Sequence, residues 1–240
     1  TAAIGVAVAV LQWRWPTIGA VPDWGLAAGI VLGASAVQLA VLGHPLATIG
    51  DGIFQVHRAA MVHAGQYFFT SVTPRPFFEI PYPVALYVVA QPFWRFFPTE
   101  FDLVFLLRIL TVAVNGLVGV TLYGAVRRQW GTRGIALTCV LLWTFARAPL
   151  EALSNANLTN AFGQAAFGAA MGVFLWSGAG GAVSRAAFAL SAVLMTTAFL
   201  SHFGTAIVGA CVLGAASLTL VAARGGARRT GLALAAVGIA

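Results

Sequence analysis

The sequence predicts an all-α membrane protein, a polytopic bundle of transmembrane helices, from its composition and from the length and pattern of its apolar runs. Hydrophobic residues make up 60% of the 240 residues, only 8% are charged, and the mean hydropathy is +0.91. A soluble domain has about 25% charged residues, so the polar side chains here are too few to cover a water-exposed surface. The long apolar runs also lack the alternation of a membrane β-barrel, and helices satisfy their own backbone amides in lipid.

Six apolar runs approach the length of about 20 residues that a transmembrane helix needs. We expect spans at 24–43, 103–126, 134–150, 160–177, 186–201 and 203–223. No soluble second domain is expected, so residues 1–240 are predicted to form a single transmembrane domain. The chain begins at Thr1 and ends at Ala240 within a further apolar run, which we interpret as a fragment of a longer chain.

Arginine supplies all thirteen basic side chains and predicts the orientation of the bundle, because short cytoplasmic loops collect positive charge. The main clusters lie at 127–133, at Arg185 and at 224–229. Successive clusters are separated by two predicted spans, so all three lie on one side, which we assign as cytoplasmic. The loop at 149–160 and the turn at 201–205 are then non-cytoplasmic.

Residues 44–102 are predicted to be a long non-cytoplasmic loop with interfacial or re-entrant elements. Its helix-breaking prolines include Pro74, Pro76, Pro81, Pro83, Pro92 and Pro98. The segment 81–97 is either a straight span or an interfacial or re-entrant piece. We prefer the second, because Arg14, Asp51 and the arginine loops then obey the charge rule together. The aromatic residues within 93–97 are typical of an interfacial belt.

An amphipathic helix is predicted over 53–64, too short to span and lying in the membrane interface. Its polar positions are Gln55, His57 and Arg58. Asp51 precedes this helix, where the helix dipole favours the ionised carboxylate. Two roles remain open for Asp51, a catalytic one and a helix cap. Likewise, the polar loop as a whole is either functional or merely solvated.

Several motifs resemble the membrane glycosyltransferases of the GT-C fold, which use polyprenyl-phosphate sugars. They are Gly50-Asp51-Gly52-Ile53-Phe54-Gln55-Val56-His57, Phe77-Phe78-Glu79-Ile80-Pro81-Tyr82-Pro83-Val84-Ala85-Leu86-Tyr87, Arg108, Arg127-Arg128-Gln129-Trp130-Gly131, Asn157-Leu158-Thr159-Asn160-Ala161-Phe162-Gly163-Gln164 and Ser201-His202-Phe203-Gly204-Thr205. Together they span most of residues 24–223 in the order of that fold. The resemblance implies an acidic residue acting at the outer membrane face, just after the first span.

From this resemblance we expect a glycosyltransferase that takes a lipid-linked sugar at the non-cytoplasmic face, with Asp51 as the catalytic base. Transfer needs a carboxylate for the proton and positive charge for the departing phosphate, which arginine binds in a bidentate manner. The expected substrate-binding residues are His57, Arg58, Arg75, Glu79 and His202. A hydrogen-bonded helix-end role is the alternative for His202. No cofactor is assigned, and a divalent metal at Glu79 is left open.

Two other functional classes compete with this one. A non-catalytic integral membrane subunit of a larger complex is the alternative, for which the small residues of 168–172 offer close helix contacts. A transporter ranks last, because the sequence lacks paired broken helices in repeated halves. Arg108 needs a partner inside a span, for which Glu100, Asp102 and Glu151 are candidates.

The expected partners are the lipid bilayer, a polyprenyl-phosphate sugar and protein subunits of a membrane complex, with no nucleic acid, because the arginines are scattered beside apolar runs. Cys139 and Cys211 share no metal or redox spacing and are interpreted as packing residues. The absence of lysine is typical of a genome rich in G and C. The expected location is the inner membrane of a bacterium.

Overall fold

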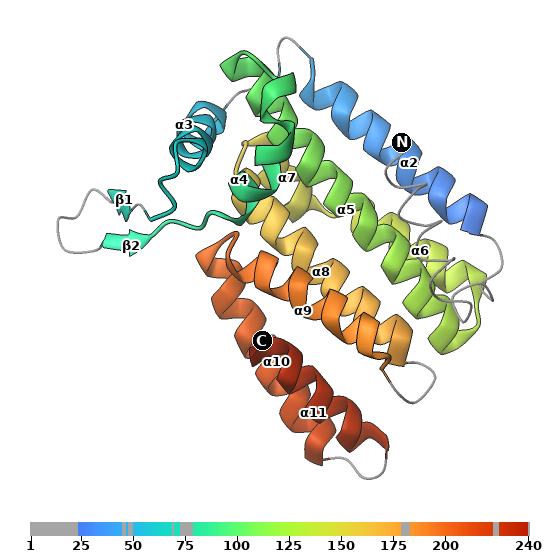
Figure 1. The fold of residues 1–240 in the computed structure, drawn as a ribbon. Coiled ribbons are helices and arrows are strands. Elements are labelled where there is room, and N and C mark those ends of the chain that lie inside the picture. The colour runs from blue at the N-terminus through green and yellow to red at the C-terminus, as the bar shows by residue number, and fades with distance from the viewer. Residues whose placement is uncertain are drawn as a thin grey trace.

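The computed structural model describes residues 24–44, 47, 50–68, 70–72, 79–178, 183–222 and 226–239, and it shows a helical bundle (Figure 1). Within this described part, four helices are long and apolar enough to cross a membrane: α2 (Trp24–Leu42), α5 (Glu100–Trp130), α8 (Leu158–Gly178) and α10 (Phe203–Ala222). With its 31 residues, α5 is about 46 Å long and exceeds a hydrocarbon layer of roughly 30 Å. These helices indicate an integral membrane protein.

Two of the six predicted spans are helices shorter than the roughly 20 residues of a full crossing. The helix α9 (Arg185–Phe199) has 15 residues, and α6 (Arg133–Thr144) has 12. The prediction of one span over 134–150 is wrong, because the chain turns after Thr144 and starts a new helix, α7 (Arg147–Ser154). In a continuous helix the ring of Pro149 would clash with the carbonyl of Phe145. A proline is compatible with the first turn of a helix, so the chain starts anew here.

The core of the bundle is the packing of α8 against α5, with α2 and α6 on one side of α5 and α9 beside α8 (Figure 1). Small residues allow the close approach: a Cβ on Gly172 would overlap Thr121, and one on Gly124 would overlap the Trp176 ring. The run 168–172 therefore lies largely inside the protein, where Ala169 and Ala170 are fully buried. The close helix contacts predicted for this run are made within the chain.

The first long loop contains short elements and no spanning helix among its described residues. These are α3 (Gly52–His63), the hairpin β1 (Thr70–Val72) and β2 (Glu79–Pro81), α4 (Ala85–Ala90) and the 3₁₀ helix η2 (Gln91–Phe96). The predicted helix over 53–64 is confirmed. Figure 1 shows α3 nearly end-on while α2, α5 and α8 run across the view, so α3 lies crosswise to the bundle. The segment 81–97 holds no single long helix, because it is divided between α4 and η2.

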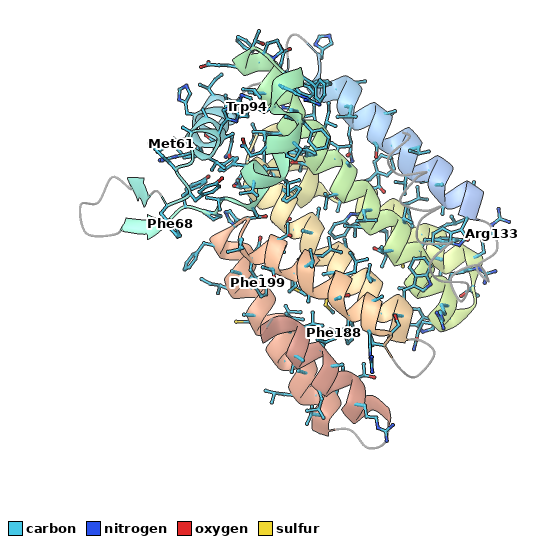
Figure 2. The ribbon with its side chains drawn as sticks, in the orientation of Figure 1. Met61, Phe68, Trp94, Arg133, Phe188 and Phe199 are labelled. Carbon is cyan, nitrogen blue, oxygen red and sulfur yellow. The ribbon has the colours of Figure 1, made fainter. Side chains whose placement is uncertain are left out.

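The helices of the bundle alternate in direction, which separates two ends. At one, the Asp51 end, α2 finishes and α5, α8 and α10 begin; at the other, the arginine end, α5, α8 and α10 finish and α6, α9 and α11 (Gly226–Ile239) begin. Figure 2 places Met61 and Trp94 at the first end and Arg133 at the second. The described residues of the three arginine clusters lie at this one end, as predicted.

Candidate functional site

Asp51 is held by a tight junction between the start of α3 and the turn after α7. The Asp51 N–H donates to the Asn155 carbonyl at 3.4 Å. Gly50 has φ +50°, and a Cβ there would overlap that same carbonyl. Ala156, fully buried beneath, is itself left-handed at φ 54°, a conformation that costs a non-glycine residue about 1–2 kcal/mol. The surrounding packing therefore fixes the backbone on which Asp51 sits.

The Asp51 carboxylate is exposed and does not cap α3: its side chain makes no capping hydrogen bond to the described helix. A helix cap was the structural alternative for this residue, and the structure gives it no support. The nearby helix α5 shows the contrast, because Thr99 and Asp102 form a complete capping box there. The side chain of Asp51 is thus available to a ligand at this end of the bundle.

The polar residues of α3 lie further along the helix. His57 Nε2 is 3.6 Å from Glu100 Oε1 at the start of α5. The Arg58 guanidinium lies over the rings of Phe54 and Tyr82, at 5.1 and 5.6 Å from their centroids. Arg58 follows Asp51 by seven residues, so it shares a helix face with Asp51 about 10 Å away. Helix geometry therefore puts the backbone positions of these two residues two turns apart on one face of α3.

Aromatic packing fixes the segment that follows the loop against α3. Tyr87 is fully buried and donates from its hydroxyl to Gln55 Oε1. His63 stacks on Trp94, with ring centroids 4.6 Å apart, and its Nδ1 is 2.9 Å from Gln91 Oε1. These contacts join α3 to α4 and η2, so the predicted interfacial elements form one unit.

Two of the expected site residues lie wholly or partly outside the described part of the chain. Arg75 lies outside the described residues. The backbone of Glu79 begins β2, where it pairs with Val72 in the antiparallel hairpin, but its side chain is outside the described part. Their roles in binding substrate stay predictions.

His202 lies away from α3, in the turn between α9 and α10, and lines a cavity of about 590 Å³ bordered by α6, α8 and α10. Burial lowers the pKa of His202 below its ordinary value. The same cavity is lined by Thr205, Asn160 and Gln164. Asn160 and Gln164 are four residues apart on α8 and hydrogen bond to each other at 3.0 Å. Asn160, Gln164 and Thr205 all belong to motifs noted in the sequence, but none of them had been assigned a role at this cavity.

A second cavity, of about 630 Å³, lies between α2 and α7. Gln38 lines it and donates to the Thr144 carbonyl at 3.3 Å. Nearby, Arg108 is buried in α5 and its Nη1 donates to the Leu42 carbonyl at 2.7 Å. Leu42 is the last residue of α2, where the helix dipole favours a positive charge. Arg108 thus stabilises the end of the helix that leads to Asp51.

Metal ligands do not gather at any of these places in the described part of the chain: no group of three or more His, Cys, Asp or Glu side chains is close enough to hold an ion. The side chain of Glu79, the residue considered for a metal, is outside that part. Accordingly, no chemical step is assigned to a metal.

Comparison with known proteins found no match. No family model matches the sequence, and no curated protein or solved structure matches it either.

Proposed function

We propose that this chain is a membrane glycosyltransferase of the GT-C type, which takes its sugar from a polyprenyl-phosphate donor at the non-cytoplasmic face of a bacterial inner membrane. The observation that carries the proposal is the Asp51 carboxylate. It is exposed, makes no capping hydrogen bond to α3, and lies at the end of the bundle opposite the arginine clusters. By the charge rule that end is non-cytoplasmic.

In the proposed reaction Asp51 is the general base. Its carboxylate takes the proton from an acceptor hydroxyl, whose oxygen forms a bond to the anomeric carbon of the sugar. The bond from that carbon to the donor phosphate oxygen breaks, and the polyprenyl phosphate leaves with the electron pair. A base of this kind contributes about 10²–10⁴-fold to a rate.

Arg58 is the cation best placed to offset charge on the departing phosphate. It follows Asp51 by two helical turns on the same face of α3, so a donor sugar phosphate bound at this face could contact both side chains. Its position over Phe54 and Tyr82 keeps it beside the aromatic segment. Arginine binds phosphate oxygens with paired N–H donors.

The alternative is a non-catalytic subunit of a membrane complex. The small residues of 168–172 give it little surface, because most of them pack inside the chain. The exposed apolar faces of α2 and α10 remain available, with Val37 and Leu218 exposed, and they suit lipid as well as a partner. We therefore favour the enzyme and keep the subunit as an outcome of the test.

The test compares the full chain with its Asp51→Asn variant in detergent, measuring sugar release from a panel of polyprenyl-phosphate donors. Asparagine keeps the size of the side chain but cannot take a proton, so transfer should fall about 10²–10⁴-fold with thermal stability unchanged. Asp102→Asn is the matched control: it makes the same change at the same end of the bundle, and Thr99 Oγ1 still accepts from the backbone there. This control should retain most of its transfer.

Equal transfer in the wild type and Asp51→Asn would remove Asp51 as the base. Absence of transfer in all three folded proteins, across the whole donor panel, would favour the non-catalytic subunit.

A further inference from the structure

The cavity between α6, α8 and α10 is lined by buried polar atoms whose hydrogen bonds are unsatisfied within the described chain. His202 Nδ1 and Thr205 Oγ1 are both buried, and neither has a hydrogen-bond partner among the described residues. Thr205 is only 8% exposed. A buried polar atom without a partner costs about 1–3 kcal/mol, so native proteins rarely keep one. Two of them lining one cavity indicate that something else completes their hydrogen bonds.

The polar groups are confined to one end of this cavity. His202 and Thr205 lie at the first turn of the 20-residue helix α10, whose first N–H groups have no acceptor within the helix. Across from them, Asn160 and Gln164 lie in the first two turns of α8. Donors and acceptors therefore meet at the Asp51 end of the bundle, where a membrane surface would be.

Deeper in the bundle the lining becomes apolar. Phe167 and Met171 continue along α8, and Val208 follows on α10. Val208 is 64% exposed, so the cavity opens sideways at this edge, toward the lipid that surrounds the bundle. The cavity volume of about 590 Å³ falls within the range of roughly 300–1,000 Å³ of ligand sites. Its shape suits a molecule with a polar head and an apolar chain.

The head that fits these groups is uncharged. None of the residues that line the cavity is an arginine or an acid. Burial also lowers the pKa of His202 and so favours the neutral imidazole, which both donates and accepts. A hydroxyl group, which also donates and accepts, complements neutral histidine, threonine and amide side chains.

We propose that this cavity binds a lipid alcohol, with its hydroxyl head hydrogen bonded to His202 and Thr205 and its hydrocarbon chain lying along Phe167, Met171 and Val208. The site is separate from Asp51, which does not line it, and its occupation does not depend on the glycosyl transfer proposed above. Binding can therefore be measured without any sugar donor.

The experiment uses the full chain in phosphatidylcholine nanodiscs and a long-chain isoprenoid alcohol that carries a diazirine at the end of its chain. After illumination, cross-links should map to α8 near Met171 and to α10 near Val208. The same chain without the hydroxyl should bind about tenfold more weakly, because one hydrogen bond to a buried group is lost. The corresponding monophosphate should bind no more tightly than the alcohol.

Two variants test the two ends of the site. Thr205→Val removes the hydroxyl at nearly constant volume and should weaken binding of the alcohol by up to about tenfold without loss of thermal stability. Val208→Trp should block the apolar part and abolish cross-linking. Its matched control is Ile207→Trp, the same change at a neighbouring position of α10 that is 50% exposed and does not line the cavity.

Several results would overturn the proposal. Equal binding of the alcohol and the hydrocarbon would show that only apolar chains enter, and tighter binding of the monophosphate would show that the head is charged. Equal loss of cross-linking in Val208→Trp and Ile207→Trp would show that the probe binds elsewhere.

Discussion

Replacing Gly50 with alanine tests the junction that positions Asp51. At φ +50° an alanine pays about 1–2 kcal/mol for the left-handed backbone. Its methyl group would also overlap the Asn155 carbonyl, and such overpacking costs a further 1–3 kcal/mol or so. The expected loss in free energy of unfolding is therefore about 2–5 kcal/mol. Gly65→Ala is the matched control, since Gly65 has φ +83° and nothing within 4 Å of the added methyl.

The assay is denaturant unfolding of both variants in the same detergent, combined with hydrogen exchange of the α3 amides. Gly65→Ala should lose only about 1–2 kcal/mol, and Gly50→Ala should lose more and expose α3 to exchange. Because Asp51 follows Gly50 directly, proposed transfer should fall in Gly50→Ala as well. Equal destabilisation of the two variants, with α3 equally protected, would refute the tight junction.

Two further predictions concern packing and pH. Gly172→Ala should destabilise the α5–α8 contact by about 1–3 kcal/mol, because the added methyl overlaps Thr121. Gly29→Ala, with nothing within 4 Å of the added methyl, should be neutral or stabilise α2 by up to about 1 kcal/mol. Thermal unfolding of both variants would check this difference in stability. Burial lowers the pKa of His202 below its ordinary value of 6.5, so below that pH the unfolded chain binds more protons than the folded one and stability falls. His202→Gln should reduce this loss, as unfolding followed from pH 8 to 5 would show, and an unchanged pH profile would contradict the burial of the neutral imidazole.

The helical bundle could be predicted from composition alone, because a chain with 60% hydrophobic and 8% charged residues needs lipid around it, and helices satisfy their own backbone amides in lipid. It also predicted α3, since the amphipathic pattern of 53–64 and the glycines around Asp51 are local signals. The span over 134–150 was wrong because hydropathy does not register a single Pro149. The mean hydropathy of the whole run is high, so it gave no sign of the turn after Thr144.

The cavity around His202 was harder to predict, because it depends on how α8 packs beside α10. The pair Asn160 and Gln164, spaced by one helical turn in an apolar helix, was the available local signal. Which helix their side chains face is a tertiary property. The same holds for Gly50, whose close contact is with a carbonyl more than a hundred residues away in the chain.

Both proposals require that the Asp51 end and the arginine end of the bundle lie on opposite sides of a membrane. Single cysteines at two exposed positions test this directly, Ala60 on α3 and Gln129 in the last turn of α5, in a background where Cys139 and Cys211 are replaced by alanine. A membrane-impermeant maleimide is added to right-side-out and to inverted vesicles. The account predicts that residue 60 reacts only in right-side-out vesicles and residue 129 only in inverted ones. Reaction of both cysteines in the same vesicles would contradict it.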